Sequence, residues 1–458
     1  MTKPTKSDKT TTTTTTTTTP TTTTELMTKI DRKIALFDIE EVQLGKKLGS
    51  GGFSDVYEIC SFVPSHDGIM SKNRRMKKAH QEARSFLMEH ATRTQTGETR
   101  YAIKFVKESL LDDCEKFDCG AQDLAFEADL LSSLNHPNIL KIRGWATHGY
   151  EAYFKSHRHD GYFIIVDKLN ETLTDKIALW KRLLDSPNTS KRLRRTILLE
   201  QIKVAMDIAN ALEYLHDNGL IYRDLKPDNI GFDVRGETKL FDFGLARQMP
   251  KSKHNNNSGS SSNNSNIGPA LKDVFRMSGK VGTARYMAPE VCLSKPYNTK
   301  ADVYSYSHVM YEIMSMMKPY DNFTKGMHKT QVVQGGERPE IHPEWPQVIQ
   351  DILSQAWHPN LQQRPTMKEI RSRLQAEITS MEQQISEPTS TLTTEGEQQQ
   401  QQRERQEQKR TIRRQSTHYE LEEQLKEQQQ QQRQHPSKER SRLLRSITRR
   451  NSLATRAA

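Results

Sequence analysis

The order of strand-like and helix-like segments constrains this fold more than any other feature of the sequence. Strand patterns come first: FDIEEVQLGKKLGSGGFSDVYEI surrounds a glycine cluster, and YAIKFV and GYFIIVDKL follow as buried strands, with helical spacing in DLAFEADLLSSL between them. TILLEQIKVAMDIANALEYLHDNG then reads as a long helix with a glycine stop, and further helices are expected near 301–317, 346–357 and 367–375. This order predicts an α+β fold of two lobes with a cleft between them.

The two ends of the chain are too polar to belong to that core. Residues 1–24 are almost wholly Thr, Lys and Pro, and the sequence past Ser380 is rich in Gln, Glu and Arg, so we expect largely disordered tails. The expected organisation is a Thr-rich tail at 1–37, one domain at 38–376 and a Gln/Arg-rich tail at 377–458. Inside the domain we expect a partly helical insertion at about 61–98 and an Asn/Ser-rich one at about 251–268.

The composition argues against several classes of protein. No run approaches the roughly 18 consecutive apolar residues of a membrane-spanning helix, and the N-terminus lacks the apolar core of a secretory signal. Cys60, Cys114, Cys119 and Cys292 form no CxxC pair, so free thiols in a reducing compartment are expected rather than a zinc site. These features predict a cytoplasmic protein, with a nuclear location as the alternative.

Part of the basic excess lies at the C-terminal end. The net charge is +11, and the stretch from Glu439 onward carries six arginines against one acid. Such a tail suits acidic partners, anionic lipid or nucleic acid, and a solvated end without a partner is the alternative. Nucleic acid is the weakest of these partners, because no aromatic residues alternate with the basic ones and no binding module is recognisable.

Two strings in the first half of the domain suit a phosphate-containing ligand. GSGGFSDV, at 49–56, places glycines between two strands, where the backbone can approach phosphate oxygens closely, although most glycine clusters are simple turns. YAIK ends a strand in Lys104, and a lysine buried there needs a partner, whereas a surface lysine does not. Glu127 is the candidate partner, because it lies on the apolar side of the helical stretch that follows.

The string YRDLKPDNIGF, at 222–232, supplies the groups that act on a transferred phosphoryl group. Asp224 can accept a proton from a hydroxyl, and Lys226 can neutralise charge on the group being transferred. The amide oxygen of Asn229 suits magnesium, and Asp242 in FDFG supplies the carboxylate that this cation still needs. Phosphoryl transfer requires this combination of positioned carboxylate, metal ligands and cations.

Together these strings resemble the catalytic domain of eukaryotic protein kinases. The resemblance covers about residues 38–376 and rests on motifs in the family's order and spacing: Gly49-x-Gly51, Lys104, Glu127, Arg223-Asp224-Leu225-Lys226, Asn229, Asp242-Phe243-Gly244 and Ala288-Pro289-Glu290. It implies a bilobal fold, with a small β-rich N-lobe that contains the αC helix and a larger helical C-lobe. It also implies ATP and Mg²⁺ as cofactors and proteins as substrates.

The resemblance assigns roles to individual residues. Asp224 would be the catalytic base, Lys226 the cation at the phosphate, and Asn229 and Asp242 the magnesium ligands. The nucleotide-binding residues would be Leu48, Gly49, Ser50, Gly51, Gly52, Val56, Ala102, Lys104, Glu127, Asp167 and Leu169. Val166 would be the gatekeeper before a hinge at 167–169. Supporting roles would fall to a buried stack of Leu131, Ile142, Tyr222 and Phe243, to Asp302 as a brace for the catalytic loop, and to an Arg364–Glu290 pair.

The same resemblance predicts the hydroxyl that is phosphorylated. DLKPDN and Gly282-Thr283 resemble serine/threonine kinases, and VVQGGERPEIHPEWPQVIQDILSQAWHPNLQQRPTMKEI is similar to the tyrosine-kinase-like group, whose members are mostly serine/threonine-specific. A protein serine/threonine kinase in intracellular signalling is therefore expected. The alternative is a pseudokinase scaffold, which the presence of Lys104, Asp224, Asn229 and Asp242 disfavours.

Some positions depart from the family pattern or bear on regulation. Gly231 replaces a leucine expected beneath the adenine, which predicts weaker nucleotide binding unless a neighbour fills the gap, and tighter binding in Gly231→Leu. In the activation segment, which includes Thr283, Arg223 would meet a phosphorylated residue, for which Ser278 is the leading candidate. Constitutive activity or control by the insertion at 61–98 is the alternative. In the tail, RRQS and RRNS make Ser416 and Ser452 candidate substrate sites of basic-directed kinases.

Overall fold

The structure is a computed structural model that describes residues 34–63, 74–93, 97–151, 153, 158–250 and 274–386. The predictions for the Thr-rich tract, the Asn/Ser-rich insertion, Ser416 and Ser452 lie outside these residues. The chain divides into two units, Met1–Glu382 and Gln383–Ala458, and the fold described below belongs to the first. No helix among the described residues is long and apolar enough to cross a membrane.

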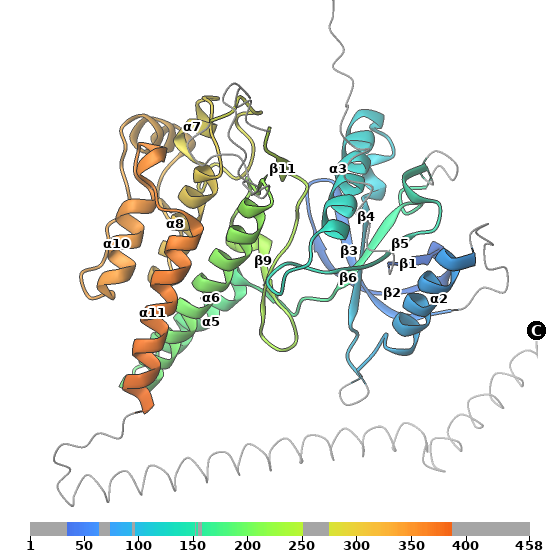
Figure 1. Cartoon of the computed structure of the whole chain (residues 1–458), viewed down its shortest axis with the longest axis horizontal. Coiled ribbons are helices and arrows are strands. Elements are labelled where there is room, and N and C mark those ends of the chain that lie inside the picture. Colours follow the sequence, from blue (N-terminus) through green and yellow to red (C-terminus); the bar gives the residue numbers. More distant parts are fainter. Residues whose placement is uncertain are drawn as a thin grey trace, which may run out of the picture. The chain divides into compact units, whose positions relative to one another are not determined.

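Within the described residues, six strands form one sheet in the order β1-β5-β6-β4-β3-β2 (Figure 1). β1 runs parallel to β5, and the other neighbours are antiparallel. β4 and β6 lie inside the sheet, and their apolar residues are almost completely buried, as expected for strands covered on both faces. The bounds are β1 Ala35–Phe37, β2 Val42–Ser50, β3 Ser54–Phe62, β4 Tyr101–Val106, β5 Ile142–Ala146 and β6 Phe163–Asp167.

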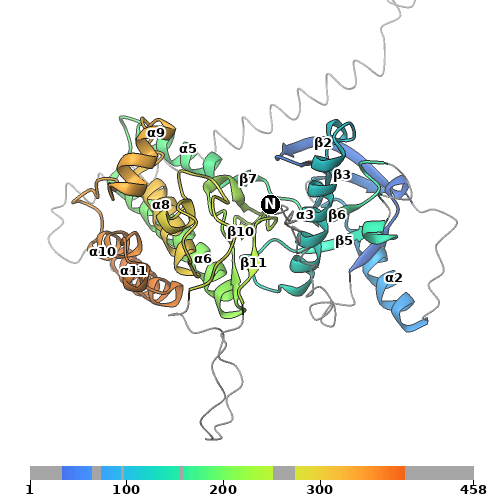
Figure 2. The same cartoon turned by 90° about the horizontal axis from the view of Figure 1, so that it is seen from above.

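Helix α3 (Cys114–Ser133) packs against β4 and β5 of this sheet (Figures 1 and 2). Asp113 caps its N-terminus, where the carboxylate accepts a hydrogen bond of 3.1 Å from the Lys116 backbone amide. Its buried face includes Leu124, Ala128 and Leu131, which recur at the spacing of an amphipathic helix. The helix predicted from DLAFEADLLSSL is therefore confirmed, and it begins about two turns earlier than that string.

Helix α2 (Arg74–Glu89) lies in the predicted insertion and packs on the added edge strand β1. The Arg84 guanidinium donates to the Leu36 carbonyl oxygen at 2.9 Å, and it forms an ion pair with the buried carboxylate of Glu41. His80 Nδ1 lies 2.6 Å from the Ile34 carbonyl oxygen. This helix therefore holds the N-terminal strand against the edge of the sheet.

The second lobe is mainly helical (Figure 2). Helix α8 (Lys300–Ser315) is buried along almost its whole length and packs against α6 (Lys191–Asp217) and α10 (Gln347–Ala356). The helical patterns predicted in this half are confirmed, as is the α+β two-lobed fold class. Further helices of this lobe are α5 Leu173–Leu184, α7 Pro289–Cys292, α9 Lys325–Met327, the π-helical η6 His328–Gln334 and α11 Met367–Ser386.

Short strands and turns frame the loops between these helices. A small sheet has the order β10-β9-β7, and β8 pairs with β11. Their bounds are β7 Glu171–Thr172, β8 Leu220–Ile221, β9 Ile230–Phe232, β10 Thr238–Leu240 and β11 Arg247–Gln248. The 3₁₀ turns are η2 Ile39–Glu41, η3 Glu108–Leu110, η4 Gly149–Glu151, η5 Pro227–Asn229 and η7 Leu361–Gln363. The segment from β8 to β10 carries the predicted catalytic string.

Candidate active site

Asp224 lies at the centre of a hydrogen-bonded group in the loop between β8 and β9. Its Oδ1 accepts bonds from the backbone amide and the hydroxyl of Thr283, at 2.8 and 2.9 Å. Its Oδ2 accepts from Lys226 Nζ at 2.7 Å and from Asn229 Nδ2 at 3.1 Å. Because both oxygens are engaged, this buried carboxylate has a defined orientation.

The Lys104 ammonium joins the sheet to α3 and to the segment after β10. Lys104 Nζ lies 2.6 Å from Glu127 Oε2 and 3.2 Å from Asp242 Oδ1. The predicted Lys104–Glu127 pair is thus present, and Glu127 Oε1 also accepts a bond from the Phe243 amide at 3.3 Å. Lys104 therefore contacts both lobes, the sheet lobe through Glu127 and the helical lobe through Asp242.

The charges of this trio follow from burial and from the lysine. Burial alone would lower the pKa of Lys104, but the carboxylates of Asp242 and Glu127 raise it above its usual value, so the ammonium is retained. Burial raises the pKa of Glu127, whereas Lys104 lowers the pKa of Asp242. Asp242 is therefore the more firmly ionised carboxylate, and its side chain is 45% exposed, so it is open to a ligand.

Asn229 and Asp242 fit the predicted magnesium site as two of several ligands. Asn229 Nδ2 donates to the Asp224 carbonyl oxygen at 2.9 Å as well as to its carboxylate, so the amide oxygen is the atom left for a cation. No group of three or more His, Cys, Asp or Glu side chains in the described residues could hold a metal ion. Mg²⁺ is usually held by one or two protein groups together with substrate phosphates and water, and Asn229 and Asp242 would supply two such groups.

Two residues of the site have left-handed backbone conformations that non-glycine residues rarely adopt. Arg223 has φ 73° and Asp242 has φ 61°. Asp302, on α8, accepts bonds from the amides of Tyr222 and Arg223, at 2.9 and 2.8 Å. The predicted bracing role of Asp302 is thus supported by direct contacts, and those contacts offset the strain at Arg223.

Gly282 explains how Thr283 can reach Asp224. It has φ 95°, and a Cβ atom there would collide with the Arg223 carbonyl oxygen. Only glycine allows the activation segment to approach the catalytic loop this closely. The close approach of the activation segment to the catalytic loop therefore explains why glycine precedes Thr283.

The glycine cluster forms the turn between β2 and β3. The Gly51 amide donates to the Ser54 carbonyl oxygen at 2.8 Å, and a Cβ atom at Gly49 or Gly52 would meet no other atom within 4 Å. In the sheet register Val56 lies opposite Lys104, so the two side chains share one face. Ala102 lies on that face as well, and the nearby Leu48 is 36% exposed.

At the end of β6, where the expected hinge begins, the Asp167 carboxylate forms an ion pair with Arg143. Arg143 Nε and Nη2 donate to the two Asp167 carboxylate oxygens, both at 2.8 Å. The carboxylate is therefore engaged within the protein. No sequence motif indicates Arg143, because the pairing of β5 with β6 determines its partner.

A neighbouring side chain fills the space at Gly231, which is the alternative that the sequence left open. A Cβ atom at Gly231 would lie 2.7 Å from Leu169 Cδ1 and 3.2 Å from the Glu171 carbonyl oxygen. The hinge side chain of Leu169 already occupies this space, with Phe241 also close by. The apolar surface that the family leucine would supply is thus provided from the hinge.

The activation segment contacts the catalytic loop at Ser278. Arg223 Nη1 donates to Ser278 Oγ at 2.7 Å and to the Tyr297 hydroxyl at 3.3 Å. Burial and then the nearby Arg223 lower the pKa of Arg247, so each of these two guanidiniums feels the charge of the other. Further along, Arg364 forms the predicted pair with Glu290, at 2.6 and 3.0 Å.

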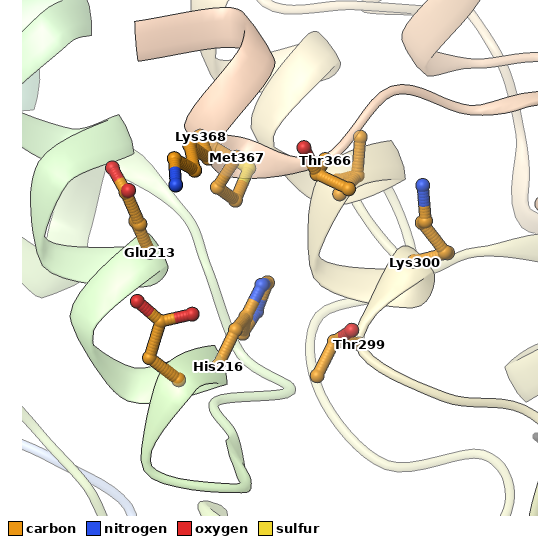
Figure 3. A pocket seen from close by; sticks show the side chains of 9 residues that line it. Glu213, His216, Thr299, Lys300, Thr366, Met367 and Lys368 are labelled. Atoms are coloured by element: carbon orange, nitrogen blue, oxygen red, sulfur yellow. The ribbon is translucent and has the colours of Figure 1, made fainter. Parts of the chain in front are cut away.

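Asp302 has a third partner that the motifs did not indicate. His216 Nε2 lies 2.9 Å from Asp302 Oδ2, and this histidine points from α6 into a pocket of about 100 Å³ (Figure 3). None of the predicted nucleotide-binding or catalytic residues lines the pocket. Its walls are Glu213, His216, Asp217, Thr299, Lys300, Val303, Thr366, Met367 and Lys368. The pocket is linked to the catalytic loop through its wall residue His216, which contacts Asp302, the residue that binds the Tyr222 and Arg223 amides.

The β-sheet lobe carries Lys104 and Glu127, and the helical lobe carries Asp224, Lys226 and Asn229 in one loop. This combination defines the protein kinase class of folds. The profile of the family "Protein kinase domain" matches residues 88–374, so the chain belongs to the protein kinase family. The predicted resemblance to this family is confirmed.

The similar proteins are serine/threonine kinases. The chain is 35% identical to serine/threonine-protein kinase STY46 of Arabidopsis thaliana over 173 residues, which cover 38% of this chain and 26% of STY46. It is 29% identical to serine/threonine-protein kinase VIK of the same species over 282 residues, which cover 60% of this chain and 54% of VIK. The chain thus spans about half of VIK and about a quarter of STY46. These matches support the predicted likeness to the tyrosine-kinase-like group.

Proposed function

We propose that this chain is a protein serine/threonine kinase that transfers the γ-phosphate of ATP to hydroxyl groups of protein substrates. The observation that carries the proposal is the network around Asp224, where Lys226, Asn229 and Thr283 all bind one carboxylate. Lys104 adds a retained positive charge beside Asp242. These are the groups that phosphoryl transfer requires.

Each group has a role that its contacts support. Asp224 accepts the proton of the substrate hydroxyl as that oxygen forms its bond to the γ-phosphorus, and the bond to the β-phosphate oxygen breaks. Lys226, 2.7 Å from Asp224, is placed to neutralise the transferred group. Thr283 orients the base through its two hydrogen bonds. Asn229 and Asp242 would hold Mg²⁺, which supplies positive charge at the β- and γ-phosphates.

The nucleotide would lie between the glycine turn and the hinge. Lys104 would bind the α- and β-phosphates, oriented by Glu127, beneath the backbone of Gly49, Ser50, Gly51 and Gly52. Leu48, Val56 and Ala102 would cover one face of the adenine. Leu169 would support the other face, because its side chain fills the space above Gly231.

A phosphate-transfer assay tests the proposal. Purified chain is incubated with Mg²⁺, radiolabelled ATP and a protein acceptor, beside Asp224→Asn and a control, Asp351→Asn, at an exposed site on α10. We expect label on Ser and Thr with wild type and control, and a rate lower by about 100-fold or more in Asp224→Asn. Mg·ATP binding should persist in the variant.

Three outcomes would overturn the proposal or part of it. Mg·ATP binding by wild type without transfer to any acceptor would identify a pseudokinase scaffold. Equal transfer by wild type and Asp224→Asn would remove Asp224 from the mechanism. Label on tyrosine alone would overturn the serine/threonine assignment.

Phosphorylation of Ser278 is proposed as the activating modification. Its hydroxyl is exposed and already lies 2.7 Å from Arg223, and a phosphate there gains charge-assisted bonds to that guanidinium. Replacement of Ser278 by Ala should lower the activity of phosphorylated enzyme toward that of dephosphorylated enzyme. Full activity in Ser278→Ala would contradict this role. The cytoplasmic location and the partners of the tails remain predictions.

A further inference from the structure

Gly120 is an unexpected residue in the interior of α3. Glycine in the middle of a helix costs about 1 kcal/mol relative to alanine, so a glycine there usually has a packing reason. A Cβ atom at Gly120 would lie 2.8 Å from Cβ of Phe53, 3.4 Å from its Cγ and 3.6 Å from its Cδ1. Phe53 therefore occupies the space in which any other residue would place its first side-chain carbon.

Phe53 belongs to the turn that carries the glycine cluster. It follows Gly52 directly, and its carbonyl oxygen accepts a bond of 3.0 Å from the Lys107 amide at the end of β4. Its side chain is 37% exposed, so it is not held in place by deep burial. The close approach to Gly120 is thus the contact that places the tip of the β2–β3 hairpin on α3.

The contact lies on the same side of α3 as the ion pair with Lys104. Gly120 and Glu127 are seven residues apart, which is close to two helical turns, so they project from one face about 10 Å apart. One rigid helix therefore holds the glycine turn at one end and orients Lys104 further along.

We propose that Gly120 and Phe53 are positioning residues that seat the glycine turn on α3, so that the turn and the Lys104–Glu127 pair are placed together over the nucleotide phosphates. This inference rests on the proposed kinase function for its nucleotide. Gly120 lies outside the family motifs, and Phe53 is the one residue from Gly49 to Phe53 to which the resemblance assigns no nucleotide contact.

The geometry predicts an unusual response to a small substitution. Cβ of Phe53 is fixed by its backbone, so a rotamer change cannot relieve a contact with a new Cβ at position 120. The hairpin or the helix must move instead. Gly120→Ala should therefore displace the glycine turn, although alanine favours the helix itself.

Steady-state kinetics tests the proposal. We expect Gly120→Ala to raise KM for ATP about 10-fold, because small displacements of positioning groups have large effects, with a smaller change in kcat. The melting temperature should not fall. The neighbouring exposed Cys119→Ala is the matched control and should leave KM for ATP unchanged. An unchanged KM in Gly120→Ala would overturn the proposal.

Two backgrounds at position 53 isolate the contact. Phe53→Ala keeps the Cβ atom and Phe53→Gly removes it. Gly120→Ala should therefore raise KM further in the Phe53→Ala background and have no added effect in the Phe53→Gly background. The same fold-change in both backgrounds would show that Gly120 acts through something other than this contact.

Hydrogen exchange without nucleotide separates this inference from the proposed function. The amides of Lys107 and Gly51, which bond to Phe53 and Ser54, should exchange faster in Gly120→Ala than in wild type. Unchanged exchange would overturn the contact, whatever the enzyme's activity. If these amides exchange faster in Gly120→Ala while the wild-type chain transfers no phosphate, the contact stands and only the kinase function is refuted.

Discussion

At the scale of single residues, the Leu169 side chain occupies the space that a side chain at position 231 would need. The family pattern places a large residue at position 231, whereas here the hinge residue Leu169 reaches into that volume. The two positions are 62 residues apart in the sequence and belong to different elements. Leu169 therefore provides an apolar surface beneath the expected adenine, although Gly231 considered alone departs from the pattern.

Gly231→Leu is therefore expected to weaken nucleotide binding rather than strengthen it. A leucine there would displace Leu169 and press on the Glu171 carbonyl oxygen, so the dissociation constant for Mg·ATP should rise by roughly 10-fold, the scale of a 1–3 kcal/mol overpacking cost. Titration calorimetry measures this. The combined Leu169→Ala, Gly231→Leu variant exchanges the two volumes and should recover most of the affinity. Tighter Mg·ATP binding by the single variant Gly231→Leu would contradict this prediction and indicate a gap beneath the adenine.

Contacts between residues of the family motifs could be predicted from the sequence, and contacts that depend on how neighbouring segments lie against each other could not. The Lys104–Glu127 and Arg364–Glu290 pairs are present as expected, because each buried charge needs one particular partner. The Arg143–Asp167 pair and the filling of Gly231 depend on which atoms face each other across neighbouring strands. No motif reports that register.

At the scale of elements, α8 shows how a buried helix can carry polar groups into the core. Asp302 near its start binds the catalytic loop, and His308 lies fully buried further along. His308 Nδ1 donates to the Tyr304 carbonyl oxygen at 3.0 Å, and Nε2 lies 3.1 Å from the Tyr320 hydroxyl oxygen. Complete burial of the ring favours its neutral form. The helix itself was predicted from its pattern, but the burial of its polar face was not.

The neutral state of His308 predicts a loss of stability in mild acid. Burial, with smaller effects of Arg338, His328 and Arg364, lowers the pKa of His308 to about 3 from 6.5. Because the unfolded chain takes up this proton first, the free energy of unfolding should fall as pH drops below 6.5, by about 1.4 kcal/mol per pH unit from this group. Urea denaturation between pH 7.5 and 5 measures the slope.

A variant should remove this part of the pH dependence. His308→Gln lacks the titrating ring, so its stability should fall less steeply between pH 6.5 and 5 than that of wild type, whatever its stability at pH 7.5. The exposed His342→Gln is the control and should keep the wild-type slope. Identical slopes in all three proteins would mean that His308 is protonated in the folded state.

At the scale of the whole described unit, the chain adds an edge strand and a helix to the sheet lobe. The order of strand-rich and helix-rich parts predicted the two lobes, and the glycine-flanked strands predicted the hairpin. The three-residue β1 is too short to be recognised, and its parallel pairing with β5 depends on α2, which lies in the insertion. A local pattern cannot report a contact between segments more than 40 residues apart.

Arg84 should be the residue through which α2 holds this addition in place. Its guanidinium binds the Glu41 carboxylate and the Leu36 carbonyl oxygen and lies 4.7 Å from the Phe37 ring centroid. Arg84→Ala removes the ion pair with the buried Glu41 carboxylate and the bond to the Leu36 carbonyl oxygen, so we expect a loss of about 3 kcal/mol in the free energy of unfolding. Adding Glu41→Gln removes the buried negative charge and should recover part of this loss.

Local and global measurements together test this role. Because the Thr147 amide donates to the Phe37 carbonyl oxygen at 2.9 Å, its hydrogen exchange reports whether β1 stays on the sheet. In Arg84→Ala this amide should exchange faster, and urea should unfold the protein at a lower concentration. Lys78→Ala removes only an exposed pair with Glu82 on the same helix and should change stability by less than about 0.5 kcal/mol. Equal effects of the two substitutions would show that α2 is attached by its apolar face, with no special contribution from Arg84.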